Sequence, residues 1–174
     1  NPNAVKFILK EPVSYGTSHS FKKREDADEN PFAKSIFDIG DVISVFYMDK
    51  MVTVEKADEA DWDELLPELA VPIRAADSVK PSNGTGEKIG GAIGVAISDD
   101  PKIAEISAIL DDRIRPFLAS DGGWLEIVSL EDNILKIRYE GACGSCPSSL
   151  TGTLMAIENM IKEEIDPAIE VVAV

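Results

Sequence analysis

The sequence predicts an α+β protein built from two small domains, and three observations lead to that prediction. The chain has 174 residues, 44% of them apolar, which is enough for two small hydrophobic cores. Strand-like and helix-like patterns of apolar residues occur on both sides of residues 77–100. That stretch is rich in Ser, Pro, Asn and Gly, which is typical of a flexible linker. We therefore expect domains at residues 1–76 and 101–174, joined by a linker at 77–100.

The first half begins with a predicted strand and a predicted helix. Residues 5–9 are suited to a short strand, and we expect His19, in the polar stretch that follows, to be exposed in a loop. Asn30-Pro31 predicts the start of a helix, because Asn is a good N-cap and Pro is pre-organised for the first helical position. Gly40 can end that helix, since glycine is common just beyond a helix C-terminus.

A β-hairpin and a second helix complete the first half. Residues 42–48 and 51–55 predict two strands joined by a tight turn. Apolar residues that recur at helical spacing from Trp62 onward predict the helix. Pro67 and Pro72 each lack the backbone N–H that a helix interior needs, so we expect this helix to be kinked or short.

In the second half, the sequence predicts a helix, two strands, a second helix and a last strand, in that order. Residues 121–123 (Asp-Gly-Gly) predict a turn, and residues 124–130 and 134–139 predict the two strands that follow it. Residues 168–174 predict a last strand. Each of the two helices is predicted from an apolar stripe. The stripes are Ile103, Ile106, Leu110, Ile114 and Phe117 in the first helix, and Leu150, Leu154, Ile157 and Ile161 in the second.

The charge of the chain argues against two classes of partner. The formal net charge is −15, from 32 Asp and Glu against 17 Lys and Arg. A surface this acidic repels phosphate backbones and anionic lipids, so we expect no nucleic-acid and no membrane partner. The sequence also shows no apolar stretch of bilayer length and no secretory pattern at its N-terminus. We expect a bacterial cytoplasmic protein or, if a leader was removed, one of the mitochondrial matrix.

Cys143 and Cys146 are the only cysteines of the chain. They form a Cys-x-x-Cys motif between a predicted strand and a predicted helix, where helix N–H groups lower the pKa of a thiol. Two cysteines do not make the disulfide framework of a secreted protein, so we expect a reducing compartment. Two thiolates are half of the ligands that a tetrahedral metal or an iron–sulfur cluster usually requires.

Three interpretations of the cysteine pair remain open on these residues. A thioredoxin-like redox centre normally follows a βαβ start, whereas a helix and a hairpin precede this motif. A structural zinc site needs four ligands, and the one histidine, His19, lies across the linker. A cluster bridged by two thiolates from each of two chains suits an isolated pair. With one histidine far away in the sequence, hydrolytic catalysis has no support.

Longer motifs of the second half relate it to a known family. These are Arg115-Pro116, Asp121-Gly122-Gly123 and, above all, Gly141-Ala142-Cys143-Gly144-Ser145-Cys146-Pro147-Ser148-Ser149. Through them, residues 102–174 resemble the C-terminal domain of the NifU/Nfu family of iron–sulfur cluster scaffold proteins. The family usually has an acidic residue after Asp-Gly-Gly, and this chain has Trp124. We expect Trp124 either to change a local polar contact or partner surface, or simply to begin a strand and pack on a helix.

The first half resembles the N-terminal domain found in Nfu proteins. The matching segments are Asn1-Pro2-Asn3, Val5-Lys6-Phe7, Pro31-Phe32-Ala33, Ser44-Val45-Phe46, Val52-Thr53-Val54 and Asp61-Trp62. The two resemblances together leave only the linker uncovered.

The resemblance implies a function without enzymatic activity. Cys143 and Cys146 would be cluster ligands, and two chains would form a homodimer around one bridging [4Fe–4S] cluster. The cluster would pass from upstream assembly proteins to apo iron–sulfur client proteins. A thiol–disulfide oxidoreductase that uses the same cysteines, and a dimeric zinc-binding interaction module, are the alternatives.

Overall fold

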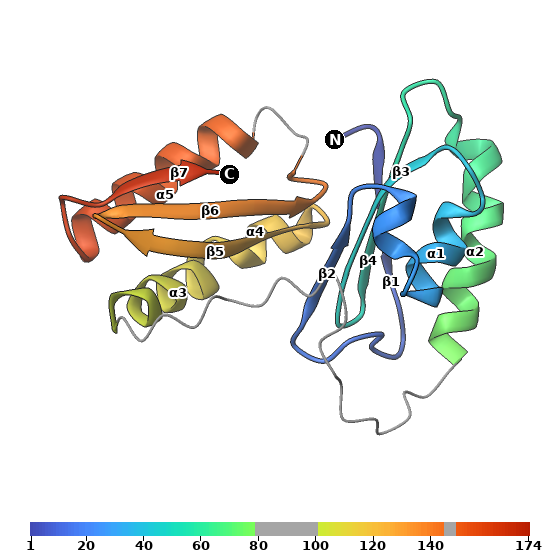
Figure 1. The fold of residues 1–174 in the computed structure, drawn as a ribbon, viewed down its shortest axis with the longest axis horizontal. Coiled ribbons are helices and arrows are strands. Elements are labelled where there is room, and N and C mark those ends of the chain that lie inside the picture. Colours follow the sequence, from blue (N-terminus) through green and yellow to red (C-terminus); the bar gives the residue numbers. More distant parts are fainter. Residues whose placement is uncertain (79–100, 145–148) are drawn as a thin grey trace. The chain divides into compact units, whose positions relative to one another are not determined.

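The computed structural model describes residues 1–78, 101–144 and 149–174, so most of the predicted linker lies outside the described residues. The chain forms two compact units (Figure 1). Each unit combines helices with a β-sheet, which confirms the predicted α+β class. In the part of the chain that the structure describes, no helix is long and apolar enough to cross a membrane.

The N-terminal unit is a four-stranded antiparallel sheet with the strand order β1-β4-β3-β2. Both of its α-helices lie on the same side of the sheet (Figure 1). The core between them contains Ile36 of α1 and Leu69 of α2, both fully buried. The elements are β1 (Ala4–Ile8), β2 (Ser18–Phe21), the 3₁₀ turn η1 (Arg24–Ala27), α1 (Pro31–Phe37), β3 (Val42–Met48), β4 (Met51–Lys56) and α2 (Trp62–Ser78).

Most predictions for this unit are confirmed. The side chain of Asn30 caps α1 by accepting a hydrogen bond from the Ala33 N–H at 2.9 Å. Strand β1 and the hairpin of β3 and β4 fall where the sequence predicts them. At the hairpin turn, Asp49 adopts the left-handed conformation with φ 51°. The N-terminal end of α1 and the position of the hairpin turn were therefore predictable from local cap and turn chemistry, whereas α1 ends at Phe37, before Gly40.

One expectation for the N-terminal unit is wrong, and a second, that the helix containing Pro67 and Pro72 is kinked or short, is wrong as to its length. His19 lies in strand β2, half-buried, and its ring stacks on that of Tyr47 with centroids 4.6 Å apart. The sequence of β2 is largely polar, which is why a loop was expected there, and its antiparallel pairing with β3 makes it a strand of the sheet. Helix α2 is not short: it continues for 17 residues through Pro67 and Pro72. Its buried residues pack into the core, and that packing outweighs the two missing N–H groups.

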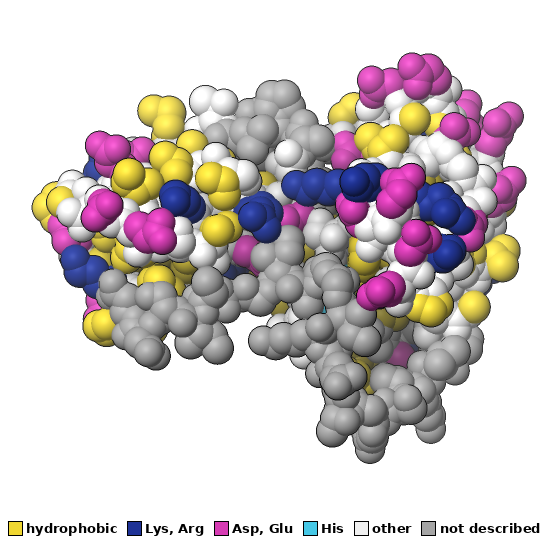
Figure 2. Space-filling model, viewed as in Figure 1, with side chains coloured by type: hydrophobic (Ala, Val, Ile, Leu, Met, Phe, Trp, Pro, Cys, Tyr) yellow, Lys and Arg dark blue, Asp and Glu magenta, His cyan; other side chains and the backbone are white. Residues whose placement is uncertain are grey.

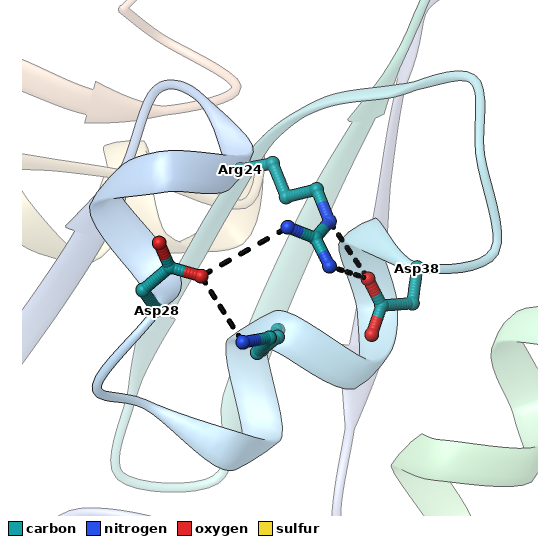
Figure 3. Close-up of polar contacts among 4 residues, drawn as sticks. Arg24, Asp28 and Asp38 are labelled. Atoms are coloured by element: carbon teal, nitrogen blue, oxygen red, sulfur yellow. Dashed lines mark hydrogen bonds and ion pairs between the residues drawn. The ribbon is translucent and has the colours of Figure 1, made fainter.

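A surface network of ion pairs joins η1 to α1 (Figure 3). Arg24 Nη2 lies 2.6 Å from Asp38 Oδ1, at the C-terminal end of α1. Asp28 Oδ1 lies 3.1 Å from Lys34 Nζ and 3.9 Å from Arg24 Nη1. The hydrogen bond and the charge of Asp38 raise the pKa of Arg24 above its ordinary value. These side chains are exposed, so the network is expected to contribute little to stability.

The C-terminal unit is a three-stranded sheet with the order β5-β6-β7. Strands β5 and β6 form an antiparallel hairpin that turns at Asp132 and Asn133 with φ 50° and 62°, and β7 runs parallel to β6. The sheet and helices share one core, which includes Leu125, Ile137 and Ile157. The elements are α3 (Pro101–Arg113), α4 (Arg115–Ser120), β5 (Gly123–Glu131), β6 (Ile134–Gly141), the π-type turn η2 (Ser149–Thr153), α5 (Leu154–Glu164) and β7 (Glu170–Ala173).

The first helix predicted for this half is in fact two helices. Helix α3 ends at Arg113 and α4 begins at Arg115, because Pro116 has no N–H to continue the ladder and its ring crowds the preceding turn. The predicted stripe is buried as far as Ile114, whereas Phe117 is 73% exposed. The remaining elements of this half are confirmed, except that the side chain of Leu150 lies outside the described residues.

Acidic side chains are spread over both units rather than gathered in one patch, on the face drawn in Figure 2. This distribution agrees with the even spread of Asp and Glu along the sequence.

Candidate metal-binding site

Cys143 lies directly beyond the end of β6, in a turn that two backbone hydrogen bonds hold. The Ala142 N–H donates to the Gly122 carbonyl at 3.1 Å, and the Gly144 N–H donates to the Gly141 carbonyl at 3.0 Å. The first bond fastens the cysteine turn to the turn that precedes β5. Cys143 is 3% exposed and belongs to the hydrophobic core of the C-terminal unit. Cys146, the other predicted ligand, lies outside the described residues.

Gly123 makes the space that the Cys143 side chain occupies. In the β5–β6 ladder, Gly123 stands opposite Gly141, two residues before Cys143. A Cβ atom placed on Gly123 would lie 2.1 Å from Cys143 Sγ and 2.7 Å from Cys143 Cβ, so no larger residue fits without moving the cysteine. The sulfur therefore rests against bare backbone. The turn-forming role expected for the two glycines holds for Gly122, with φ 79°, while Gly123 has this separate steric role.

Tyr139 shares the core with Cys143. It stands opposite Leu125 in the β5–β6 ladder, on the face that packs into the core. Its hydroxyl is buried and has no hydrogen-bond partner in the described structure. Burial, together with the negative charge of a Cys143 thiolate, raises the pKa of Tyr139 to about 12. Tyr139 and Cys143 are both buried in the one hydrophobic core of this unit.

Arg115 fixes the helices against the first strand of the site. Its Nε donates to the Leu125 carbonyl at 3.0 Å, and its Nη1 donates to Ser107 Oγ at 3.0 Å and Asp111 Oδ1 at 2.7 Å. Its guanidinium also lies over the ring of Trp124, 5.4 Å from the centroid. Trp124 lies near the start of β5 and packs on Arg115 of α4, as the second expectation states, while a changed partner surface stays a prediction.

The arrangement fits a sulfur-containing inorganic group better than a metal ion held by one chain. Among residues 1–78, 101–144 and 149–174, no three His, Cys, Asp or Glu side chains come together as metal ligands. His19 belongs to the N-terminal unit. Within its described residues, the C-terminal unit offers a thiol, a neighbouring glycine that leaves room for it, and a buried hydroxyl with no acceptor among those residues. Thiolates and hydrogen-bond donors are what an iron–sulfur cluster requires.

The sequence identifies Cys143 as a candidate ligand. It does not identify Gly123 as the residue against which the sulfur lies, or Tyr139 as a residue of the same core. The alternation of side chains along a strand could have indicated Tyr139, because Tyr139 and Gly141 occupy one face at the end of β6, just before Cys143. The close approach of Gly123 to Cys143 joins residues 20 apart and depends on the hairpin register.

Comparison with known proteins gives two family matches that together span most of the chain. The NifU-like domain matches residues 106–172, and the N-terminal domain of the scaffold protein Nfu/NifU matches residues 1–78. These are the two domains whose motifs the sequence carries.

Curated relatives match along the length of the chain. It is 36% identical over 165 residues to NifU-like protein 4, mitochondrial, of Arabidopsis thaliana, covering 92% of this chain and 58% of that protein. It is 35% identical over 163 residues to the human NFU1 iron-sulfur cluster scaffold homolog, mitochondrial, covering 93% of this chain and 64% of that protein. The chain thus spans less than two thirds of the length of these relatives. The crystal structure of Staphylococcus aureus protein SAV1430 aligns at 29% identity and a TM-score of 0.37, covering 41% of this chain and 86% of that one.

Proposed function

The chain belongs to the NifU/Nfu family, and from that premise we propose that it is an iron–sulfur cluster scaffold or carrier. In this proposal, Cys143 and Cys146 of two chains together hold one [4Fe–4S] cluster, which is then transferred to apo-proteins. The cluster is cargo, and the protein itself is not an enzyme.

The observation that carries the proposal is the fixed position of the Cys143 side chain against Gly123. Its sulfur rests on the backbone of Gly123 at the end of β6, in a turn fixed by the Ala142–Gly122 hydrogen bond. A sulfur held in this way is pre-positioned as a ligand, and the missing side chain of Gly123 leaves the space that it needs. Since a Cys-x-x-Cys motif supplies half of a Cys₄ set, a second copy of the chain completes it. A cluster held between two subunits can be released more easily than one enclosed by a single chain.

The N-terminal unit is proposed to act in recognition or positioning. It contains no cysteine, so its contribution is docking of a client apo-protein or of an upstream assembly protein. We retain the division into domains 1–76 and 101–174 with a linker at 77–100, although α2 continues to Ser78. The two relatives described above are named as mitochondrial proteins, which favours the mitochondrial matrix over the bacterial cytoplasm as the compartment.

The alternative functions have less support. A thioredoxin-like Cys-x-x-Cys motif normally follows a βαβ start, whereas two helices and the β5–β6 hairpin precede Cys143. A dimeric zinc-binding module would use the same cysteines of two chains, so the metal content of the reconstituted protein distinguishes it from a cluster carrier.

Anaerobic reconstitution with iron and sulfide tests the proposal. We expect a brown protein with about four irons and four sulfides per two chains, whose cluster activates the colourless apo-form of a [4Fe–4S] enzyme. In parallel, the protein is incubated with zinc alone and is assayed for disulfide reduction, which tests the two alternative functions. A colourless protein that binds zinc in place of iron, or one that reduces disulfides catalytically, contradicts the proposal.

A further inference from the structure

The hydroxyl of Tyr139 is a buried hydrogen-bond donor that has no acceptor among the described residues. Tyr139 is 3% exposed, and its Oη contacts no hydrogen-bond partner in the described parts of the chain. Buried side-chain polar atoms are almost always bonded, so an exception has an explanation. A phenol has one proton to donate, and the acceptor is expected to be a group that binds next to it.

The position of the tyrosine indicates what that group is. Tyr139 and Cys143 belong to one core cluster, and Cys143 is the described residue whose negative charge acts on the phenol. Leu125 stands opposite Tyr139 in the ladder, and Gly123, on which the sulfur rests, precedes Leu125 by two residues on the same face. The phenol and the sulfur therefore project from neighbouring positions on one face of the β5–β6 hairpin.

From this arrangement we propose that Tyr139 is a positioning residue for the cluster and donates its hydroxyl hydrogen bond to a sulfide of the bound cluster. The inference rests on the proposed scaffold function and adds a residue outside the Cys-x-x-Cys motif. Hydrogen bonds to sulfur stabilise the negative charge of a cluster and orient its ligands. Tyr139 thus sets how firmly the cluster is held before it is handed on.

The test compares two Tyr→Phe variants that each remove one buried hydroxyl. Tyr139→Phe removes the donor without changing the packing of the ring. Tyr47→Phe is the matched control, because the Tyr47 hydroxyl is bonded to Asn30 Nδ2 at 2.7 Å within the N-terminal unit. Both proteins and the wild type are reconstituted anaerobically, and the bleaching of the cluster by an iron chelator is followed. We expect about tenfold faster bleaching in Tyr139→Phe alone, the lower end of the effect of such supporting partners.

A spectroscopic measurement separates a hydrogen bond from general loosening of the site. Resonance Raman spectra of the Fe–S stretching modes are recorded in H₂O and D₂O. The wild type and Tyr47→Phe are expected to show a deuterium-sensitive shift that Tyr139→Phe lacks, while all three keep the same Tm within a few degrees.

The outcomes distinguish this inference from the function on which it rests. If the wild type holds a cluster and Tyr139→Phe equals it in bleaching rate and deuterium shift, the inference is overturned and the scaffold function stands. Equal acceleration in both Tyr→Phe variants also overturns the inference. If the wild type holds no cluster at all, the proposed function fails first.

Discussion

The two units of this chain each bury a tyrosine in a sheet, and the surroundings of the two hydroxyls differ. Tyr47, in the N-terminal unit, bonds to the side chain of Asn30, and that bond partly offsets the rise in its pKa that burial causes. Tyr139, in the C-terminal unit, has no partner in the described structure and has Cys143 as its charged neighbour. The Tyr47 hydroxyl therefore has a partner within its own unit, whereas the Tyr139 hydroxyl has none among the described residues and shares its core with the Cys143 thiol. Cluster chemistry is therefore expected to belong to the second unit alone.

The largest effect is expected from Cys143→Ser. A serine hydroxyl is not the soft thiolate that iron–sulfur clusters require, so reconstituted protein should lose its brown colour completely. The measurement is the absorbance of the reconstituted protein together with its iron content. Far-UV circular dichroism of the cluster-free protein should match the wild type. A variant that keeps its full cluster would exclude Cys143 as a ligand.

Gly123→Ala tests whether the close contact between Gly123 and Cys143 positions the sulfur. The new methyl group would meet Cys143 Sγ at 2.1 Å, so the sulfur must move and most of the cluster should be lost. Overpacking should also cost about 1–3 kcal/mol of unfolding free energy, measured by denaturant titration.

Gly152→Ala is the matched control, since a Cβ there would meet nothing within 4 Å. It should keep both cluster and stability. Full cluster content in Gly123→Ala would show that the close contact does not position the sulfur.

Leu69→Ala tests whether the stability of the N-terminal unit affects the cluster site of the C-terminal unit. Leu69 is fully buried in the N-terminal core, and its truncation should reduce the stability of that unit by about 2–5 kcal/mol. Iron per folded chain should remain at the wild-type value, because the cysteine site lies in the other unit. A thermal melt followed by iron analysis of the soluble fraction checks both statements. A parallel loss of cluster would contradict the separation of roles.

A pH dependence is expected from His19. Burial lowers its pKa below the ordinary value of 6.5. As the pH falls through 6.5, the unfolded chain takes up a proton before the folded chain does, so this part of the stability is present above 6.5 and lost below it. The Tm of the wild type should therefore fall more than that of His19→Gln between pH 8 and pH 5. Parallel curves for the two proteins would show that His19 contributes nothing.

The smallest effect is expected from Arg24→Ala. The variant removes the contacts of Arg24 with Asp38 and Asp28, but these groups are solvated and their interactions are weak. The Tm should change by no more than a few degrees, and cluster content should not change. A large loss of stability would mean that the network of Figure 3 holds α1 in place.

Local chemistry made much of the fold predictable from the sequence. The cap at Asn30 and the turns at Asp49 and Asp132-Asn133 are each set by a few adjacent residues, and the structure has them where they were expected. The errors arise where tertiary context decides. Strand β2 is polar and depends on its neighbour β3, and α2 passes through two prolines because its apolar face is buried.

The candidate site was predictable only in part. Cys143 is conspicuous in the sequence as one of two cysteines. The sequence indicates only a turn residue at Gly123 and only an ordinary strand residue at Tyr139. Their relation to the cysteine depends on the register of β5 and β6, in which Gly123 stands opposite Gly141. Sequence periodicity indicates which face a residue occupies, but it does not show which distant residue it will meet there.

The most direct test of the central claim is the native mass of the anaerobically reconstituted protein. The account predicts a species with the mass of two chains plus one [4Fe–4S] cluster, which separates into single chains when the cluster is removed. It predicts no such species for Cys143→Ser. A cluster-loaded single chain, or a dimer whose mass includes zinc in place of iron and sulfide, would contradict the claim that two chains share one cluster.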